Sequence, residues 1–494
     1  MTQFNAIHDV LHFNGATALC SIVCRPANNN IFPMRDKKPL SSWFLVFMAL
    51  LSISTLTRAQ DVGVAVPSET ATLATSASDA PETELWNAHG QITSATQKHA
   101  SFSSRYAGPN SLQSGEGAKG TVDATLFLGL RLWHSAELYM NPEIDQGFGL
   151  SGTTGVAGFP SGAAYKVGRD SPYGRLQRTF VRQTFALDDE SNPVDSGPNT
   201  LAGRKPNSNL TLTVGKFSVV DVFDNNSYAH DPRADFLNWS VIDSAAFDYA
   251  ADAWGYTYGM AAEWTQQDWT ARAGLFAMSS EPNGESIDKT FAQREWVLEL
   301  ERRYQWHELR GTVRLLAFVN QARMAYYGDA MALAQVSGQP PDVSNVRRSA
   351  SKSGYAINVE QELAKDLGMF ARFSQNSGNT EAYDFTDVNQ SLAAGLSAKG
   401  SYWNQPTHTL GTAFAINGLS PEAQAYFAAG GIGILVGDGQ LPHYAREQIL
   451  ETYYTVNLNK ALTVTGDYQY IRNPAYNVDR GPVSIWGLRL HAEF

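Results

Sequence analysis

Apolar and polar residues alternate with a period of two in segment after segment between about Trp86 and the C-terminal Phe494. From Ala124 to Leu132, the even positions are Ala, Leu, Leu, Leu and Leu, and the odd positions are Thr, Phe, Gly and Arg. Successive side chains of a strand point to opposite faces, so this segment has one apolar and one mixed face. No segment beyond the N-terminal region has 18 consecutive apolar residues, which excludes ordinary transmembrane helices. The pattern predicts an all-β chain.

The same alternation returns in eight further segments, and their opposite faces carry many Glu, Arg and Asn residues. The segments run over 210–214, 254–264, 269–275, 296–300, 309–319, 355–359, 367–373 and 450–458. In a soluble sandwich, the apolar face would form the core and the charged face would contact water. In a membrane barrel, the apolar face would contact lipid and the charged face would line the interior. Alternation alone does not decide between them.

The end of the chain favours the barrel. Residues 484–494 place Trp486, Leu488, Leu490 and Phe494 on one face, with Arg, His and Glu on the other. A final amphipathic strand ending in an aromatic residue resembles the signature of outer-membrane barrels, which the barrel assembly machinery reads. Aromatic residues near other strand ends suit interfacial girdles, and these are Trp254, Trp264, Trp269, Tyr453 and Tyr454.

We therefore expect a closed transmembrane antiparallel β-barrel, because only closure satisfies every backbone group in lipid. Roughly 410 residues at about 25 per strand predict 16 strands, with 18 as the alternative. Leu126, Leu128 and Leu130 should face lipid together with Leu488 and Leu490. Residues 420–429 are the exception, because a Ser cap, a Pro at the first helical position and a following Gly pair predict a short helix in a loop.

We expect the first 84 residues to be a targeting segment and a lead-in rather than part of the barrel. From Met34 onward, basic residues precede the apolar run Trp43–Leu51, and Thr57-Arg58-Ala59 resembles a cleavage site. We divide the chain into a leader and signal peptide (1–59), a periplasmic lead-in (60–84) and a barrel (85–494). Translation from Met34 is expected; a longer functional leader starting at Met1 is the alternative.

The charge balance excludes a basic nucleic-acid surface. The formal net charge is −11, with 37 Lys+Arg against 48 Asp+Glu. Both cysteines, Cys20 and Cys24, lie in the predicted leader, so the exported part needs no disulfide.

The stretch Lys216–Trp239 combines the groups that a sugar needs. Carboxylates and amides hold hydroxyls, while aromatic rings accept the apolar face of a pyranose. The stretch contains Asp221, Asp224, Asp231, Asp235, Asn225, Asn226, Asn238, Arg233, Phe217, Phe223, Tyr228 and Phe236, with Asp243 just beyond. The alternative is an acidic solvated loop, since Asp and Asn also favour turns.

Several strings resemble the carbohydrate-selective porins of Gram-negative outer membranes, the OprB-type family. They are His89-Gly90-Gln91, 107–112, 126–143, the stretch at Gly215, 254–259 and the glycine-rich residues 428–439. The resemblance extends over nearly all of residues 86–494. It implies a 16-stranded barrel that admits mono- and oligosaccharides by facilitated diffusion.

A sugar pore needs charges of both signs at its constriction, because they orient hydroxyls and penalise unpaired ions. We infer which residues face inward from the alternation of the strands on either side of a turn at Trp133-His134-Ser135. The alternation over 177–187 gives further inward residues. The predicted pore lining is Arg131, Trp133, Glu137, Tyr139, Arg178, Arg182, Lys216, Asp221, Asp224, Asn225, Arg233 and Asp235. A wall charge satisfied by its neighbour is the alternative for each of them. We place Asp189 in an external loop, away from the pore.

Other chemistries lack a signature. No G-x-S-x-G, H-E-x-x-H or paired-Cys spacing occurs, so no enzyme and no cofactor are expected. Calcium at Asp221–Asn226 is disfavoured, because the spacing of a calcium loop is missing. The expected partners are sugars in transit, outer-membrane lipid and, through Phe494, the assembly machinery, with the oligomeric state open. A structural or adhesive barrel is the alternative function, but mixed inward charges favour the channel.

Overall fold

The computed structural model describes residues 83–164 and 168–494. Within them, 16 strands form one closed antiparallel barrel, which β1 closes by pairing with β18 from Gln91–Glu493 to His99–Ile485. The predicted barrel and strand number are therefore confirmed. The predicted signal peptide, its cleavage site and the start at Met34 lie outside the described residues, as does nearly all of the lead-in.

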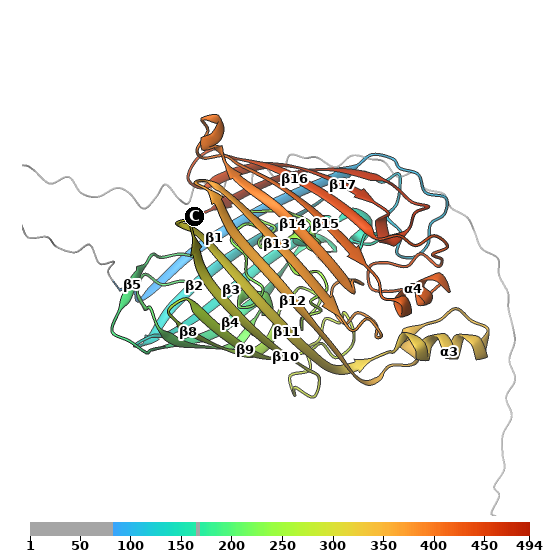
Figure 1. Ribbon diagram of the computed structural model, residues 1–494, viewed down its shortest axis with the longest axis horizontal. Coiled ribbons are helices and arrows are strands. Elements are labelled where there is room, and N and C mark those ends of the chain that lie inside the picture. The colour runs from blue at the N-terminus through green and yellow to red at the C-terminus, as the bar shows by residue number, and fades with distance from the viewer. Residues whose placement is uncertain (1–82, 165–167) are drawn as a thin grey trace, which may run out of the picture. The chain divides into compact units, whose positions relative to one another are not determined.

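The strands follow one another around the barrel in chain order (Figure 1). Their bounds are β1 Trp86–His99, β2 Lys119–Trp133, β3 Ala136–Gly147, β4 Arg169–Ala186, β7 Asn209–Phe217, β8 Thr257–Gln266, β9 Trp269–Ala277, β10 Arg294–Trp306, β11 Leu309–Met324, β12 Arg348–Ala364, β13 Leu367–Asn376, β14 Gln390–Lys399, β15 Thr409–Gly418, β16 Glu447–Asn457, β17 Leu462–Arg472 and β18 Val483–Glu493. A separate two-stranded hairpin, β5 Ser191–Val194 and β6 Gly203–Pro206, interrupts the series.

The two ends of the barrel differ in the length of their connections. At the end where β1 begins and β18 finishes, most connections are short: 134–135, 267–268, 307–308, 365–366, 400–408 and 458–461. At the opposite end they are long: 100–118, 148–168, 218–256, 278–293, 325–347, 377–389, 419–446 and 473–482. Outer-membrane barrels have short periplasmic turns and longer extracellular loops, so the end with the short turns faces the periplasm.

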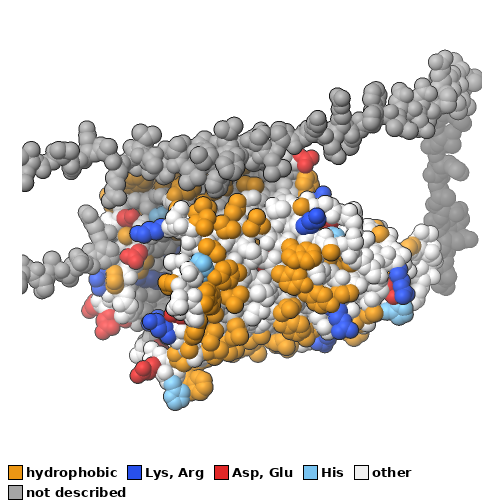
Figure 2. Space-filling view, turned by 90° about the horizontal axis from the view of Figure 1, so that it is seen from above, with side chains coloured by type: hydrophobic (Ala, Val, Ile, Leu, Met, Phe, Trp, Pro, Cys, Tyr) orange, Lys and Arg blue, Asp and Glu red, His pale blue; other side chains and the backbone are white. Residues whose placement is uncertain are grey.

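The predicted lipid face is confirmed. Leu126, Leu128 and Leu130 are 41, 37 and 46% exposed, whereas the intervening Phe127 is 7% exposed. On β18, Leu488 is 52% exposed and the neighbouring Arg489 is 1% exposed. Figure 2 shows the resulting outer face, with hydrophobic side chains gathered between the two ends and charged ones toward the ends.

Two of the expected girdle aromatics point elsewhere. Tyr453 is 2% exposed and packs edge-on to Phe236 inside the barrel, at 4.8 Å between ring centroids. Trp254 precedes the start of β8 and lies in a loop. Tyr453 is adjacent to the outward-facing Tyr454, so the sequence pattern fits either phase there, whereas the alternation before β8 continues past the first residue of the strand, Thr257, to Trp254. Trp264, Trp269 and Trp486 do face outward, with 43 to 51% exposure.

The predicted loop helix is α4, Pro421–Ala428, and the Ser420 side chain accepts a hydrogen bond from the Ala423 N–H at 3.1 Å. Two further helices were not predicted: the single turn α2, Trp239–Ile242, and α3, Tyr327–Ser337. None of the three is part of the barrel wall: α2 packs against β14 and β15, and α3 and α4 stand together at the extracellular end (Figure 1). In the described part of the chain, no helix is long and apolar enough to cross a membrane.

Candidate functional site: the interior of the barrel

Residues 218–256, the inner loop, connect β7 to β8 and fold into the barrel. Arg489 on β18 donates hydrogen bonds of 2.7 to 2.9 Å to three carbonyls of this loop, those of Pro232, Ala234 and Asp235. Other inward side chains hold the loop from further around the wall: Glu299, Asn358, Arg372, Glu451 and Gln469. The stretch singled out in the sequence therefore lies inside the barrel, and its backbone is satisfied by the wall.

Asp224 and Asn225 have different surroundings despite being adjacent. Asp224 is 1% exposed and accepts hydrogen bonds from the Ser244 N–H and hydroxyl at 2.6 and 2.9 Å and from Asn358 at 2.8 Å. Its carboxylate is thus an internal anchor of the loop and not part of a pore lining, contrary to the prediction. The Asn225 side chain is exposed, and its carbonyl accepts a bond from Asn358.

Arg233 bonds the inner loop to the barrel wall, whereas Asp235 bonds to the backbone within the loop. Arg233 forms ion pairs with Asp123 on β2 at 2.7 Å and Glu143 on β3 at 3.3 Å. Asp235 accepts the backbone N–H of His230 at 3.3 Å and lines a cavity of about 860 Å³ at the periplasmic end. Burial, and then the charge of Asp231, raises the pKa of Asp235 to about 6.

Four arginines of β4 follow one wall of the barrel, and each lies over an aromatic ring. The pairs are Arg169 with Tyr173, Arg175 with Trp254, Arg178 with Tyr256, and Arg182 with Tyr139, at 4.6, 3.3, 4.9 and 5.2 Å from guanidinium carbon to ring centroid. Such cation–π contacts hold a guanidinium flat against the ring. We call this series the arginine wall.

The middle of the arginine wall is a two-point ion pair between β4 and the inner loop. Arg178 donates to Asp221 through Nε at 2.7 Å and through Nη2 at 2.6 Å. The two side chains remain 18 and 27% exposed. Burial alone would raise the pKa of the Asp221 carboxyl, but the charge and hydrogen bonds of Arg178 outweigh it, so this pKa is lowered. Asp221 is therefore a carboxylate at neutral pH.

Lys216 and Arg175 share a second carboxylate. Their nitrogens lie 3.3 and 3.4 Å from Oδ2 of Asp252, which is nearly buried. Asp252, Trp254 and Tyr256 belong to the end of the inner loop and were not among the predicted site residues. The sequence offered a signal: Asp252-Ala-Trp-Gly has turn-forming residues, and Gly255 adopts a positive φ of 94°, which a continuing strand would not.

The remaining predicted residues form a lower group near the periplasmic turns. Arg131 pairs with Glu137 at 3.1 Å, and the Tyr139 hydroxyl donates to Glu137 at 2.7 Å. Arg182 is four residues from Arg178 along β4, about 13 Å at the usual strand rise. The predicted lining residues therefore lie at two successive levels along the barrel axis, one at Arg178 and one at Arg182.

Trp133 lies at the rim rather than in the lumen. It is 60% exposed, pairs with Ala136 across a two-residue turn, and donates through its indole N–H to Gln183 at 2.8 Å. The predicted three-residue turn is wrong, because a register shift between Arg131 and Trp133 absorbs the extra residue. The inward phase of Arg131 and Glu137 is the same in both arrangements.

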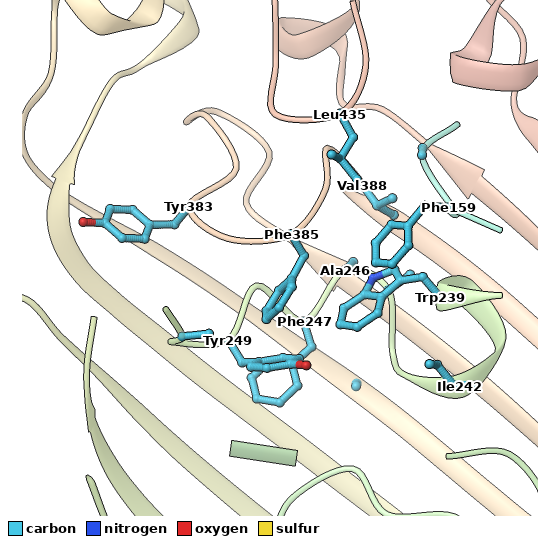
Figure 3. Close-up of a cluster of buried hydrophobic side chains, with 14 of the residues drawn as sticks. Phe159, Trp239, Ile242, Ala246, Phe247, Tyr249, Tyr383, Phe385, Val388 and Leu435 are labelled. Atoms are coloured by element: carbon cyan, nitrogen blue, oxygen red, sulfur yellow. The ribbon is translucent and has the colours of Figure 1, made fainter. Parts of the chain in front are cut away.

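On the opposite side of the lumen, loops pack into a hydrophobic cluster. Trp239 stacks on Phe159 at 5.0 Å and on Phe385 at 4.7 Å between ring centroids, and Phe385 in turn contacts Tyr249 at 4.3 Å (Figure 3). These rings come from three different connections and are all nearly buried. Charged side chains with residual exposure line the arginine wall and also β8 to β10, where Arg272 pairs with Glu263 at 2.9 Å and with Glu299 at 2.7 Å.

The charged groups do not form a metal centre. In residues 83–164 and 168–494, no group of three or more His, Cys, Asp or Glu side chains is arranged to hold a metal ion. The acids near the wall are instead engaged by arginine, lysine and backbone N–H groups. The interior therefore offers paired charges, hydrogen-bond donors and acceptors to a polar solute.

Residues 111–494 match the family described as carbohydrate-selective porin, OprB family. The chain belongs to this family. As a member of the OprB family with a closed barrel, it is an outer-membrane porin, that is, a channel and not an enzyme.

Similar proteins agree with this assignment. Porin AaxA of Chlamydia abortus is 20% identical over 360 residues, which cover 72% of this chain and 69% of that protein. Porin AaxA of Chlamydia caviae is 22% identical over 366 residues, with the same coverage. The high-pH structure of Pseudomonas putida OprB superposes with a TM-score of 0.63 at 17% identity and covers 83% of this chain and 94% of that one. That similarity shows a shared fold.

Proposed function

We propose that the channel carries neutral carbohydrates, both mono- and oligosaccharides, across the outer membrane by facilitated diffusion along the arginine wall. The observation that carries the proposal is the alternation of guanidinium groups, carboxylates and aromatic rings on that one wall. Arg175 with Trp254 and Arg178 with Asp221 supply donors, an acceptor and a ring face side by side. The family description, a carbohydrate-selective porin, supports the same class of solute.

The chemistry of the pairs explains why a neutral polyol would be favoured over an ion. A sugar hydroxyl can donate to Asp221 and accept from Arg178 without breaking their charge balance, whereas a small ion would compete with one partner and repel the other. The partly exposed rings of Tyr173 and Trp254 give the C–H face of a pyranose an apolar surface. Binding must stay weak, because a channel that holds its solute tightly conducts poorly.

The test is ion conductance of the purified porin in planar lipid bilayers during titration with sugars of increasing length. A binding free energy of about −4 kcal/mol corresponds to block at millimolar concentration. We expect reversible block by sugars at that level and weaker block by an open-chain polyol of similar size, which keeps the hydroxyls but lacks the C–H face of a ring. Absence of block by every mono- and oligosaccharide tested would contradict the proposal and leave a porin without sugar selectivity.

A further inference from the structure

The connection between β4 and β7 is an exception among the periplasmic connections. It spans residues 187–208 and contains the hairpin of β5 and β6, whereas most other turns at that end are short. In Figure 1, β5 marks the hairpin at the end of the barrel opposite to α3 and α4. Residues 195–202 connect the two short strands, and we call them the hairpin tip.

The hairpin tip reaches back into the lumen. Asn141 on β3 donates from Nδ2 to Oδ1 of Asn199 at 2.9 Å. Asn141 lies five residues beyond the first residue of β3, about 16 Å along the strand. Leu201 is 4% exposed, and its N–H donates to the Tyr139 hydroxyl at 3.2 Å. A tip that lay on the rim could not reach these partners.

Two arginines of the predicted pore lining hold the tip through its backbone. Arg182 donates from Nη1 to the carbonyl of Asn199 at 3.0 Å, and Arg131 donates from Nη2 to the carbonyl of Ala202 at 3.3 Å. Arg182 has no carboxylate within ion-pair distance in the described part of the chain. Its guanidinium is thus directed at the tip and not at an acid of the wall.

The first described residues of the chain close the other side of the tip. Glu84 accepts the N–H of Ala202 at 2.7 Å and donates its own N–H to the carbonyl of the same residue at 3.1 Å. Asn87 on β1 donates to the carbonyl of Thr200 at 2.7 Å and to the Ser196 hydroxyl at 2.9 Å. The tip is therefore bonded to β1, β3 and β4 together.

We infer that the hairpin tip is a fixed constriction on the periplasmic side, which narrows the exit of the channel and sets the largest solute that leaves it. The inference rests on the proposed function only in that solute passes along the arginine wall. The tip lies beside Arg131 and beside Arg182 of that wall, and it carries Asp195 together with the neutral polar residues Ser196, Asn199 and Thr200. A solute that has passed Arg178 and Asp221 meets these groups next.

The first experiment replaces residues 195–202 by Asn-Gly. Val194 and Gly203 pair directly, so a two-residue turn can join them. We expect the single-channel conductance in potassium chloride to rise about two-fold, because the exit widens, and larger polyethylene glycols to enter. Block by a monosaccharide should persist, because Arg178 and Asp221 are unchanged. Wild-type conductance and polymer exclusion in the assembled variant would overturn the inference.

The second experiment keeps the hairpin intact. With Cys20 and Cys24 replaced by Ser, Thr200→Cys provides a single reactive thiol on the tip, and Asp189→Cys provides the matched control on the exposed part of the same connection. A bulky methanethiosulfonate should lower the conductance of Thr200→Cys and leave Asp189→Cys unchanged. Complete labelling of Thr200→Cys by mass without a change in conductance would overturn the inference, even if the shortened hairpin fails to assemble.

The two proposals fail in different measurements. Absence of sugar block in the wild-type channel would contradict the proposed sugar transport. Unchanged conductance and polymer exclusion after the tip is removed or labelled would contradict the proposed constriction at the hairpin. Neither outcome implies the other.

Discussion

Arg178 and Asp221 join the barrel wall to the inner loop by two parallel hydrogen bonds, of 2.7 and 2.6 Å. Oδ2 of Asp221 also accepts the backbone N–H of Ser218 at 2.9 Å, which caps the first turn of the loop. One carboxylate therefore fixes where the loop enters the lumen and presents a negative charge to it. Two-point pairs of this kind are stronger and more directional than single contacts.

Asp221→Asn should weaken sugar block and shift ion selectivity toward anions. The substitution removes the negative charge and leaves Arg178 without its partner. Loss of an acceptor for sugar hydroxyls should cost roughly 1 kcal/mol, or about five-fold in the blocking concentration. The measurements are the reversal potential in a salt gradient and the sugar titration. Asp189→Asn, on the exposed β4–β7 connection, is the control, and equal behaviour of the two variants would contradict the role given to Asp221.

Arg489→Lys should loosen the inner loop. Arg489 is buried and serves three carbonyls with one planar group, whereas an ammonium on a shorter stem cannot reach all of them. We expect the free energy of unfolding to fall by about 2–3 kcal/mol and open-channel noise to increase. Urea unfolding in detergent and single-channel recording measure the two effects. Arg472→Lys, on the exposed side of β17, should change neither; wild-type stability in Arg489→Lys would refute the anchoring role.

Stability should fall as the pH rises from about 4 to 8, in part because of Asp243 in the inner loop. Burial, and then the charge of Asp224, raises its pKa to about 8, above the value of an unfolded chain. The folded state therefore holds a proton that the unfolded state releases, so this contribution is present at low pH and is lost as the pH passes 8. Asp243→Asn stays neutral and should flatten the decline. The measurement is the temperature at which the folded band disappears in gels at each pH; an unchanged slope would show that Asp243 is not the cause.

Leu396→Arg should impair assembly, and Ser397→Arg should be tolerated. The two residues are adjacent on β14, but Leu396 is 42% exposed on the outer face whereas Ser397 lines the periplasmic cavity. An arginine on the lipid face costs about 2–4 kcal/mol near the bilayer midplane, whereas in the cavity it meets water and acids. The folded fraction in membranes, measured by heat modifiability, decides. Equal folding of the two variants would contradict the assignment of Leu396 to the lipid face of β14 and of Ser397 to its inner face.

The position of the β4–β7 connection could not be predicted from the sequence. The prediction that Asp189 lies in an external loop is wrong, because it lies at the periplasmic end, on the connection that carries the hairpin. Residues 187–208 are rich in turn formers, and such a composition fits an extracellular loop equally well. Their destination depends on Tyr139, Arg131 and Arg182, whose contacts with the hairpin tip span up to 71 residues.

The sequence by itself determined the barrel, its 16 strands and the lipid face, because a strand's side-chain period of two is written directly in the order of Leu126, Leu128 and Leu130. It also determined that the stretch after Lys216 is rich in groups able to hold polar solutes. Only the tertiary structure decided which of these groups are free to do so. Asp221 and Asp224 are three residues apart, but Asp221 remains at the lumen while Asp224 is buried against Asn358 and Ser244. That difference comes from loop and wall segments 20 to 134 residues apart in the chain, whose pairing no local pattern encodes.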